Sequence, residues 1–520
     1  MPSTRRLLAV PFVASCVLAC VASDDSGRGP LPVGPDGKAD SSQGSCRGTG
    51  GATYCGKKSN GACWCDDQCA SYGDCCSDRA EVCEEAPPEG THLDYASYRV
   101  AFTNPVCRTY EYDEPIQTVD GQGTIEAKPR NVYCTQNDSG ASGSRPTSPI
   151  YNLLEWTRAL QEGDSIFLAY LSFSSSAMGT ALCDAAQRGV DVTFVLDAPT
   201  DKSNQLASCG GNVLIRGHKG GIGYQHNKII MINADAAGPG DADPDYMRVV
   251  FSSGNMSSGT VLHHENWHFI EVARKSFFAE AHRCMLNALV DEAAASSTTA
   301  YRNSVNTCRA AITFQEEDDI HAYFIPNRDD SQAVTDLMVE GIGDASTISI
   351  GAHRFAYTTM IDALSDRLQG GSDVRIRLVA DDDLYWLRPY GGGTGVKVGD
   401  NEQFEASAVA GLVRDGEGER FEVRYMETNH GQHLLHHSKY LLFEGRPGYP
   451  DAVLCGAANL TGTGFWTNFE NIYWVEIPEV VEAFRAQYGH VWDSTPMPDG
   501  EAPPVATPPN RMPARDVQFQ

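Results

Sequence analysis

The segments "LHHSKYLLF" (435–443) and "YQHNKIIMI" (224–232) share a pattern that decides how this chain is organised. In each segment, a histidine and a lysine two residues later lead directly into a run of apolar residues. A short apolar run of this kind is typical of a buried strand. The two segments therefore predict two buried strands, each with a pair of titratable side chains where it begins.

A longer internal repeat surrounds these two segments. The stretches "SIFLAYLSFSSSAMGTALCDAAQRGVDVTFVLDAP" (165–199) and "TISIGAHRFAYTTMIDALSDRLQGGSDVRIRLVADDD" (347–383) follow one plan. Each has a β-rich run, a stretch with helical periodicity, a glycine and a second β-branched run. Strand, helix and strand in this order suit a sheet with helices on its faces. The expected fold is α/β, with two pseudo-symmetric lobes that each contain a mixed β-sheet flanked by helices.

The composition limits the classes of partner. The chain has 520 residues, and its 68 acidic and 40 basic side chains give a formal net charge of −28. This charge disfavours long polyanions as partners, because no concentrated basic patch offsets it. The apolar content of 41% is enough for a sizeable core. The sequence therefore argues against a protein that coats nucleic acid and leaves open a short substrate that carries a phosphate.

The N-terminus has the pattern of an export signal. Two arginines precede an apolar stretch, residues 7–19, that is too short to span a membrane as a helix. The segment "VLAC" (17–20) resembles a bacterial lipoprotein cleavage box, in which the cysteine, here Cys20, becomes lipidated. Ordinary cleavage near Ala22 without a lipid is the alternative. The sequence predicts an exported protein, either an outer-membrane or cell-surface lipoprotein or a secreted protein.

The 17 cysteines fit an oxidising compartment, where cysteines can pair. The segment "CWCDDQCASYGDCCSDRAEVC" (63–83) resembles the somatomedin-B module, a disulfide-stapled segment that implies a protein partner and no catalysis. A zinc site is the alternative, and export argues against it. Similar spacings later in the chain predict three bridges and leave Cys455 free and buried in a strand. The predicted bridges are Cys107–Cys134, Cys183–Cys209 and Cys284–Cys308.

These observations divide the chain into six parts. Linkers are Asp-, Gly-, Ser- and Pro-rich, and a chain of that composition cannot bury a core. The predicted parts are a lipoprotein-type signal peptide at 1–20, a flexible linker at 21–44, a somatomedin-B-like disulfide module at 45–84, a first lobe at 93–310, a second lobe at 311–495 and a Pro-rich tail at 496–520.

Each copy of the repeat supplies the same four polar residues in the same order. The histidine and lysine are followed by an asparagine in a Gly/Ser/Thr-rich segment, and then by a glutamate that opens the next strand. Because side chains two residues apart on a strand share a face, each histidine and its lysine are expected to point the same way. The candidate catalytic residues are His226, Lys228, Asn255 and Glu265 in the first copy, and His437, Lys439, Asn459 and Glu470 in the second.

Two histidines that face each other can cleave a phosphodiester. A neutral imidazole is a competent nucleophile toward phosphorus, and a second, protonated imidazole can donate to the leaving oxygen. Lysine and asparagine side chains supply donors for the non-bridging oxygens as charge builds, and a carboxylate behind the nucleophilic histidine fixes its tautomer. We expect no cofactor and no metal, because the lysines take the role that a divalent ion would otherwise have.

The segment "HHENWH" (263–268) contains residue types that bind metals. On a strand, His264 and His268 would share a face, whereas Glu265 would not. The repeat also assigns Glu265 to the catalytic set, so the sequence argues against a metal site here.

The two copies resemble the phospholipase D superfamily, whose signature is HxKxxxxD followed by a Gly/Ser-rich asparagine segment and a Glu-Asn pair. The resemblance implies an α/β/α/β/α body, a phosphohistidine intermediate, His226 as the nucleophile and His437 as the general acid and base. The last position of the signature departs from the family, with Asn233 in the first copy and Glu444 in the second. In the family this aspartate is mainly structural, so the departure concerns local stability more than chemistry.

The sequence leaves three functions open. The first is an exported phospholipase D-type phosphodiesterase that hydrolyses phospholipid head groups or transfers the phosphatidyl group to an alcohol. The second is an extracellular nuclease of the same superfamily, which the Glu-Asn segments favour. The third is an inactive module that docks a protein through residues 46–83, and the two intact catalytic sets argue against it. The expected partners are a phospholipid or other phosphodiester substrate, a membrane surface reached through the lipid anchor, and a protein bound by residues 46–83. We expect a monomer.

Overall fold

The computed structural model describes the chain in several stretches. Its contacts divide the chain into two compact units, Met1–Glu89 and Gly90–Gln520. The predicted signal peptide, Cys20, the 21–44 linker and the Cys107–Cys134 bridge lie outside the described residues. The described residues are 46, 58, 59, 61, 63–65, 69, 75, 76, 91–103, 108–110, 131–133, 148–217, 222–257, 260, 263–295, 297–381, 400–426, 436–493 and 505–506.

Disulfides occur in both units. Among the described residues of the first unit, three bridges link closely spaced cysteines: Cys46–Cys65, Cys63–Cys76 and Cys69–Cys75. In the second unit, two of the predicted bridges are confirmed, Cys183–Cys209 and Cys284–Cys308. Cys455 is free and buried in a strand, as the sequence predicts.

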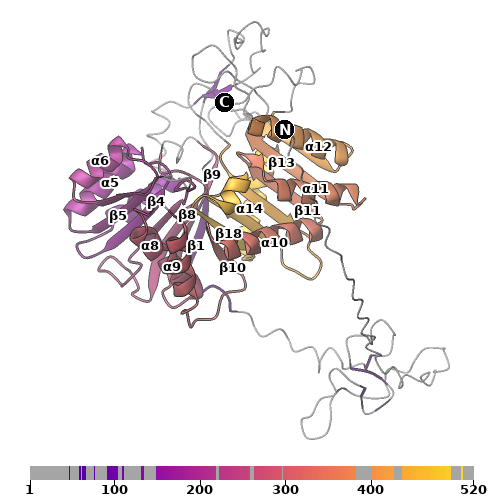
Figure 1. The fold of residues 1–520 in the computed structure, drawn as a ribbon, viewed down its shortest axis with the longest axis horizontal. Helices are drawn as coiled ribbons and strands as arrows, with labels where there is room; N and C mark the ends of the chain where they lie inside the picture. Colours follow the sequence, from indigo (N-terminus) through magenta and orange to yellow (C-terminus); the bar gives the residue numbers. More distant parts are fainter. Residues whose placement is uncertain are drawn as a thin grey trace, which may run out of the picture. The chain divides into compact units, whose positions relative to one another are not determined.

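The second unit contains two mixed sheets with one topology (Figure 1), which confirms the predicted fold class. The first sheet has the order β1-β9-β8-β7-β4-β5-β6, and the second has the order β10-β18-β16-β15-β11-β13-β14-β19. Three neighbouring strands are parallel in each sheet: β4, β5 and β6 in the first, and β11, β13 and β14 in the second. The other neighbouring strands, up to the seventh strand of each sheet, pair antiparallel. Apart from the added β19, the second sheet therefore repeats the first, strand by strand.

The strands of the first sheet are β1 (Tyr95–Thr103), β4 (Ser165–Tyr170), β5 (Asp191–Leu196), β6 (Asn212–Ile215), β7 (Ile229–Ile232), β8 (Tyr246–Ser252) and β9 (Glu265–Ala273). Those of the second are β10 (Ile320–Ile325), β11 (Thr347–Ala352), β13 (Arg375–Asp381), β14 (Phe421–Met426), β15 (Lys439–Glu444), β16 (Ala452–Gly456), β18 (Glu470–Val475) and β19 (Val505–Ala506), which comes from the Pro-rich tail. The short pairs β2 (Arg108–Tyr110) with β3 (Asn131–Tyr133), and β12 (Phe355–Ala356) with β17 (Leu460–Thr461), form separate ladders.

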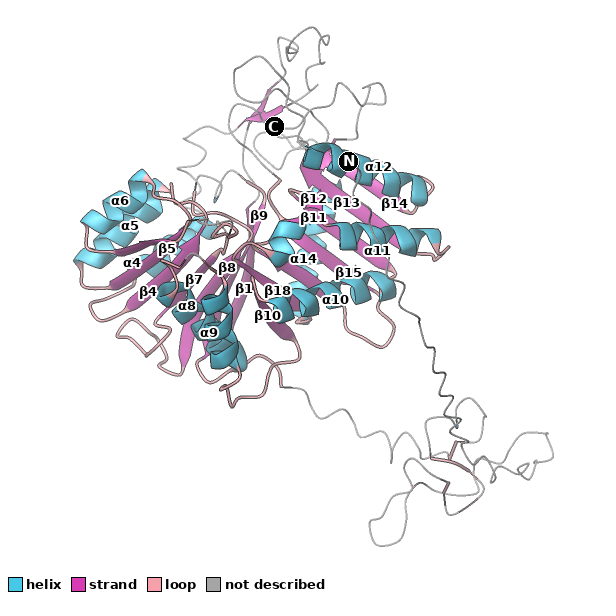
Figure 2. Ribbon diagram, in the orientation of Figure 1, coloured by secondary structure: helices cyan, strands magenta, loops and turns pink. Residues whose placement is uncertain are grey.

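Helices cover the sheets in layers (Figure 2). One apolar cluster packs α4 (Pro149–Arg158), α5 (Ser176–Gln187) and α6 (Asp201–Ser208) on the outer face of the first sheet. Another packs α10 (Arg328–Asp344), α11 (Thr358–Gln369) and α12 (Asp400–Asp415) on the outer face of the second. The third lies between the sheets and contains residues of α8 (Phe277–Asp291), α9 (Thr299–Arg309) and α14 (Pro478–Asp493). The second unit is therefore an α/β/α/β/α body.

The helical periodicity seen in the sequence corresponds to buried helix faces. In α5, Met178, Leu182 and Ala185 are fully buried, and Ser175 begins the helix by accepting a hydrogen bond from the backbone N–H of Met178. Equivalent apolar positions of α11 are buried against the second sheet. Among the described residues, no helix is both long enough and apolar enough to cross a membrane.

Candidate active site

The two histidine–lysine segments lie at the beginning of a central strand in each sheet. His226 and Lys228 come just before β7, while Lys439 is the first residue of β15, so the segments enter their strands rather than lying within them. The backbone N–H of His226 donates to the carbonyl of Phe469 at 2.9 Å, and that of His437 donates to the carbonyl of His264 at 3.1 Å. The backbone of each segment is therefore held by the other copy of the repeat.

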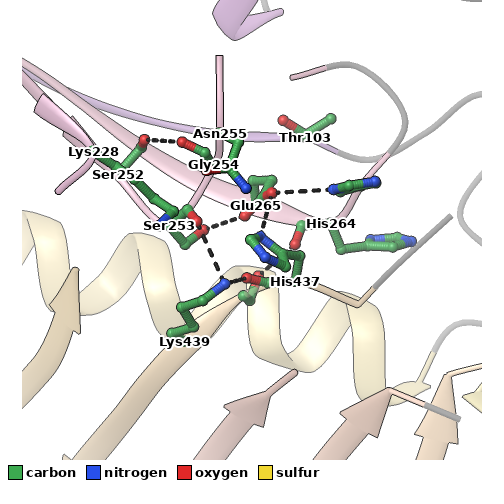
Figure 3. Close-up of polar contacts among 12 residues, drawn as sticks. Thr103, Lys228, Ser252, Ser253, Gly254, Asn255, His264, Glu265, His437 and Lys439 are labelled. Carbon is green, nitrogen blue, oxygen red and sulfur yellow. Dashed lines mark hydrogen bonds and ion pairs between the residues drawn. The ribbon is translucent and has the colours of Figure 1, made fainter. Parts of the chain in front are cut away.

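The glutamates are exchanged between the copies in the same way. The strands β9 and β18 begin at Glu265 and Glu470, as the sequence predicts. Nδ1 of His226 lies 2.7 Å from Oε2 of Glu470. Nδ1 of His437 lies 2.7 Å from Oε1 of Glu265, as Figure 3 shows. We call His226, Lys228 and Glu470 the first half-site, and His437, Lys439 and Glu265 the second half-site. Each half-site contains residues from both copies, so neither copy can form one alone.

Both lysines are buried beside their histidines. Nζ of Lys228 lies 3.0 Å from Nε2 of His226 and donates to the His226 carbonyl, and Nζ of Lys439 donates to the His437 carbonyl at 2.6 Å. Burial lowers the pKa of Lys228 to about 8 and lowers the pKa of Lys439 well below its usual value, while nearby glutamates oppose both shifts. The lysines reach the same side as their histidines, as expected from the two-residue spacing.

The histidines are nearly inaccessible to solvent, and burial lowers the pKa of each. At His226 the Glu470 carboxylate opposes this effect, so the pKa is lowered only in part. At His437 the pKa is lowered well below its usual value, first by burial and then by the charges of Lys439, His263, Lys228 and His226. Because groups of the first half-site act on His437, the two half-sites share one electrostatic environment.

The two candidate asparagines occupy equivalent turns. Asn255 follows β8 and Asn459 follows β16, and both are partly buried. Within the described part of the chain, the side-chain oxygen of each has no hydrogen-bond partner, although both oxygens are buried. Buried polar atoms are nearly always paired in folded proteins, so two matched exceptions in equivalent turns suit groups that meet a ligand.

The departures from the family signature lie away from the histidines. Asn233 follows β7 with a positive φ of 53°, accepts from the backbone N–H of Ser165 at 2.8 Å and donates to Asp164 and Asp241 at 2.9 Å. In the second copy, Glu444 pairs with Arg485 at 2.6 Å. Both residues therefore tie the end of a strand to its surroundings and do not face the catalytic histidines.

Several residues support the site although the sequence alone did not single them out. Asp197 accepts from the backbone N–H of Gln225, and Asp381 accepts from that of His436, at 3.0 and 2.6 Å. Each aspartate fixes the entry to one histidine–lysine segment. The signal was present in the repeat, because "VLDAP" and "VADDD" carry an aspartate at the end of the same strand. Asn471 similarly accepts from the backbone N–H of Lys228 at 2.8 Å.

The second half-site has a histidine-rich surrounding that the first lacks. The ring centroid of His437 lies 4.8 Å from that of His353 and 5.5 Å from that of His263. The buried rings of His264 and His436 lie 5.9 Å apart. The repeat places Leu171, Asn468, Phe469 and Gln225 at the positions equivalent to His353, His263, His264 and His436.

Comparison with known proteins identifies part of this body. Residues 338–492, which include His437, Lys439, Asn459 and Glu470, match the family model described as cardiolipin synthase, PLD-like domain. No curated protein matches the chain.

Three solved structures are similar to parts of this chain. Phosphatidylserine synthase from Haemophilus influenzae Rd KW20 is 12% identical, with 65% of this chain and 82% of that chain covered and a TM-score of 0.43. The phospholipase D family member Nuc from Salmonella typhimurium is 17% identical, with 35% and 95% covered and a TM-score of 0.25. Polyphosphate kinase from Porphyromonas gingivalis is 14% identical, with 65% and 44% covered and a TM-score of 0.42, so this chain spans less than half of that kinase. Identities and TM-scores this low say nothing about activity. The family match therefore covers residues 338–492 alone.

Proposed function

We propose that the protein is a phospholipase D-type phosphodiesterase that removes the head group of a phospholipid through a covalent phosphohistidine. The observation that carries this proposal is the exchange of glutamates, in which each copy holds the histidine of the other at 2.7 Å. Such an exchange brings two oriented imidazoles into one site, as attack at phosphorus with departure of an alcohol requires.

In the first step, Nε2 of His226 attacks the phosphorus atom and the bond from phosphorus to the head-group oxygen breaks. Nδ1 of His226 donates to Glu470, which leaves the lone pair on Nε2. The departing oxygen takes a proton from His437. In the second step, neutral His437 removes a proton from water or an alcohol, whose oxygen attacks phosphorus and breaks the P–N bond. Both histidines then regain their starting protonation.

The lysines and asparagines stabilise the charge that builds on the non-bridging oxygens. In the free protein Lys228 lies beside Nε2 of His226, so a bound phosphate must draw its ammonium away before attack. Lys439 and the side-chain NH2 groups of Asn255 and Asn459 complete the set of donors. Fixed donors in a buried site act more strongly than in water, because no solvent must reorganise.

The test is an activity panel on the full-length protein in EDTA, with phosphatidylcholine, cardiolipin, and single- and double-stranded DNA as substrates. Release of a head group without loss of DNA is the expected result. Cleavage of DNA alone would reject the lipid substrate and make the protein a nuclease of the same reaction type. Inactivity on every diester would reject catalysis and leave a binding module.

We also propose that the protein is exported and anchored by a lipid on Cys20, on the evidence of the N-terminal sequence pattern. In a bacterial host, Cys20→Ser is expected to move the protein from the membrane fraction to the soluble fraction, since a lipidated cysteine supplies the apolar anchor. The measurement is fractionation followed by immunoblotting. Unchanged partitioning of the variant would contradict the anchor.

A further inference from the structure

Three side chains at the second half-site are arranged as a metal ligand set. Ligand atoms of His263, Glu265 and His437 all lie within 4.8 Å of one another. Oε1 of Glu265 is 2.7 Å from Nδ1 of His437 and 3.5 Å from Nδ1 of His263. A single ion at about 2.0–2.2 Å from each atom would need only small side-chain shifts. All three residues are at least nine-tenths buried, with exposures of 9%, 1% and 5%.

The chemistry of the three donors favours a particular class of ion. Two imidazoles and one carboxylate are a donor set that zinc uses in proteins, with a fourth position left for water or substrate. The other carboxylate oxygen of Glu265 accepts a hydrogen bond from Ser253 at 2.6 Å, which holds the carboxylate with Oε1 toward the histidines (Figure 3).

Two cationic neighbours oppose a bound ion. Lys439 and Lys228 both act on His437, although burial lowers the pKa of each lysine, that of Lys228 to about 8. Their charges weaken the binding of a cation, so the geometry of the three ligand atoms must outweigh this repulsion.

We propose that His263, Glu265 and His437 bind a divalent transition metal ion of the zinc class, which inhibits the enzyme by replacing the Glu265–His437 hydrogen bond. Coordination through Nδ1 requires the proton on that nitrogen to move to Nε2 or to leave. A metal-bound neutral imidazole is a far weaker acid than an imidazolium, so it cannot protonate the departing oxygen. The inhibition rests on the proposed function, whereas the binding does not.

The first half-site provides a matched control within the same molecule. Asn468 occupies the position equivalent to His263, and its amide donates to Oε1 of Glu470 at 3.1 Å. The carboxylate and the catalytic histidine are the same in both half-sites, and the third ligand is present only in the second. Removing His263 should therefore abolish the metal site, and Asn468→His should create its counterpart beside His226 and Glu470.

The experiment is equilibrium dialysis of EDTA-treated full-length protein against Zn²⁺ at pH 7.5, with bound zinc measured by mass spectrometry. His263→Gln is expected to bind one zinc ion fewer than wild type, or to bind that ion at least about tenfold more weakly. Asn468→His is expected to bind one more. The exposed cluster of His92, Asp318 and Asp319 is common to all three proteins and cancels in the comparison.

Equal zinc binding by wild type and His263→Gln, with unchanged circular dichroism, would overturn the proposal. If His263→Gln does not fold, Asn468→His decides, because a chain that gains no zinc there contradicts the ligand geometry. Substrate turnover is measured in parallel against free Zn²⁺. Binding without inhibition would reject the inhibitory role, whereas binding by a protein that cleaves no diester would instead count against the proposed function.

Discussion

The two half-sites share their catalytic residues and differ in what surrounds them. The first half-site is bordered by Gln225, Asn468 and Phe469, which do not titrate near neutral pH. The second is bordered by four histidines, His263, His264, His353 and His436. Both half-sites therefore have the same histidine, lysine and glutamate, while the neighbouring positions differ in residue type. The predictions below test what the two half-sites share and what distinguishes them.

The largest expected effect tests whether the two half-sites serve one reaction. Each of the variants His226→Asn and His437→Asn is expected to lower kcat by about four or more powers of ten, because each removes one member of a single catalytic unit. The effects of substitutions within one such unit are not additive. Rates of substrate cleavage measure this, and the double variant should be no slower than either single one. A melting temperature close to that of wild type is the control. If one variant kept most of its activity, the half-sites would not act together.

The next effect tests the exchange of glutamates between the copies. Glu470→Gln is expected to act through His226, and Glu265→Gln through His437, each lowering kcat by about 10²–10⁴, since the amide favours the wrong imidazole tautomer. The exposed Glu419→Gln is the matched control. Proton NMR of the Nδ1–H resonances would assign each glutamate to its histidine. A Glu265→Gln change that altered only the His226 resonance would contradict the exchange.

Much of this fold could be predicted from sequence, whereas the exchange could not. The pattern of apolar runs and the helical periodicity at Met178, Leu182 and Ala185 follow from local geometry and correspond to buried faces. The pairing of Glu265 with His437 depends on how two sheets pack, and the linear order of the repeat places Glu265 with His226. The types of the candidate catalytic residues could therefore be predicted from the sequence. Their hydrogen-bond partners across the interface between the two sheets could not.

The position of His263 beside Glu265 could not be predicted from the sequence either. On a regular strand His264 and His268 share a face, and this argued against metal binding in "HHENWH". In the structure His263 precedes β9, where strand alternation does not apply, and its Nδ1 lies 3.5 Å from Glu265. The argument from the sequence did not consider the position of His263, because it treated the whole segment as an extended strand.

A smaller effect concerns the pH dependence of turnover in EDTA. One histidine must be neutral and the other protonated, and the pKa values of both are lowered in the free protein. The fraction in the reactive form is greatest between these two values, so kcat/KM should peak below about pH 6.5 and fall up to about tenfold per unit above it. A pH–rate profile on a neutral-head-group lipid measures this. A maximum above pH 7.5 would contradict the direction of these shifts.

The smallest effect concerns stability in acid. Burial lowers the pKa of His268 to about 3, of His282 to about 4 and of His436 to about 3, and it also lowers the pKa of His264. The unfolded chain binds protons at these groups near pH 6.5, so folded stability is complete above that pH. It is lost as pH falls toward 3–4, by about 1.4 kcal/mol per unit for each such group.

The comparison of half-sites suggests how to measure that effect. The double variant His264→Phe with His436→Gln gives the second half-site the residues that the first has at Phe469 and Gln225. The loss of unfolding free energy between pH 7 and pH 5, from urea titrations, should be smaller in this variant than in wild type. An equal loss would show that these two histidines do not couple folding to protons.

The most direct test of the account is the stoichiometry of the covalent intermediate. Rapid quenching in a mildly alkaline denaturant, which preserves the acid-labile P–N bond, followed by mass spectrometry of peptides, should find at most one phosphatidyl adduct per chain, on His226. In His437→Asn the adduct should form at least about a hundredfold more slowly, since the general acid is missing. Adducts on both histidines of one chain, or an adduct that forms at an unchanged rate without His437, would contradict a single phosphorus atom held between the two half-sites.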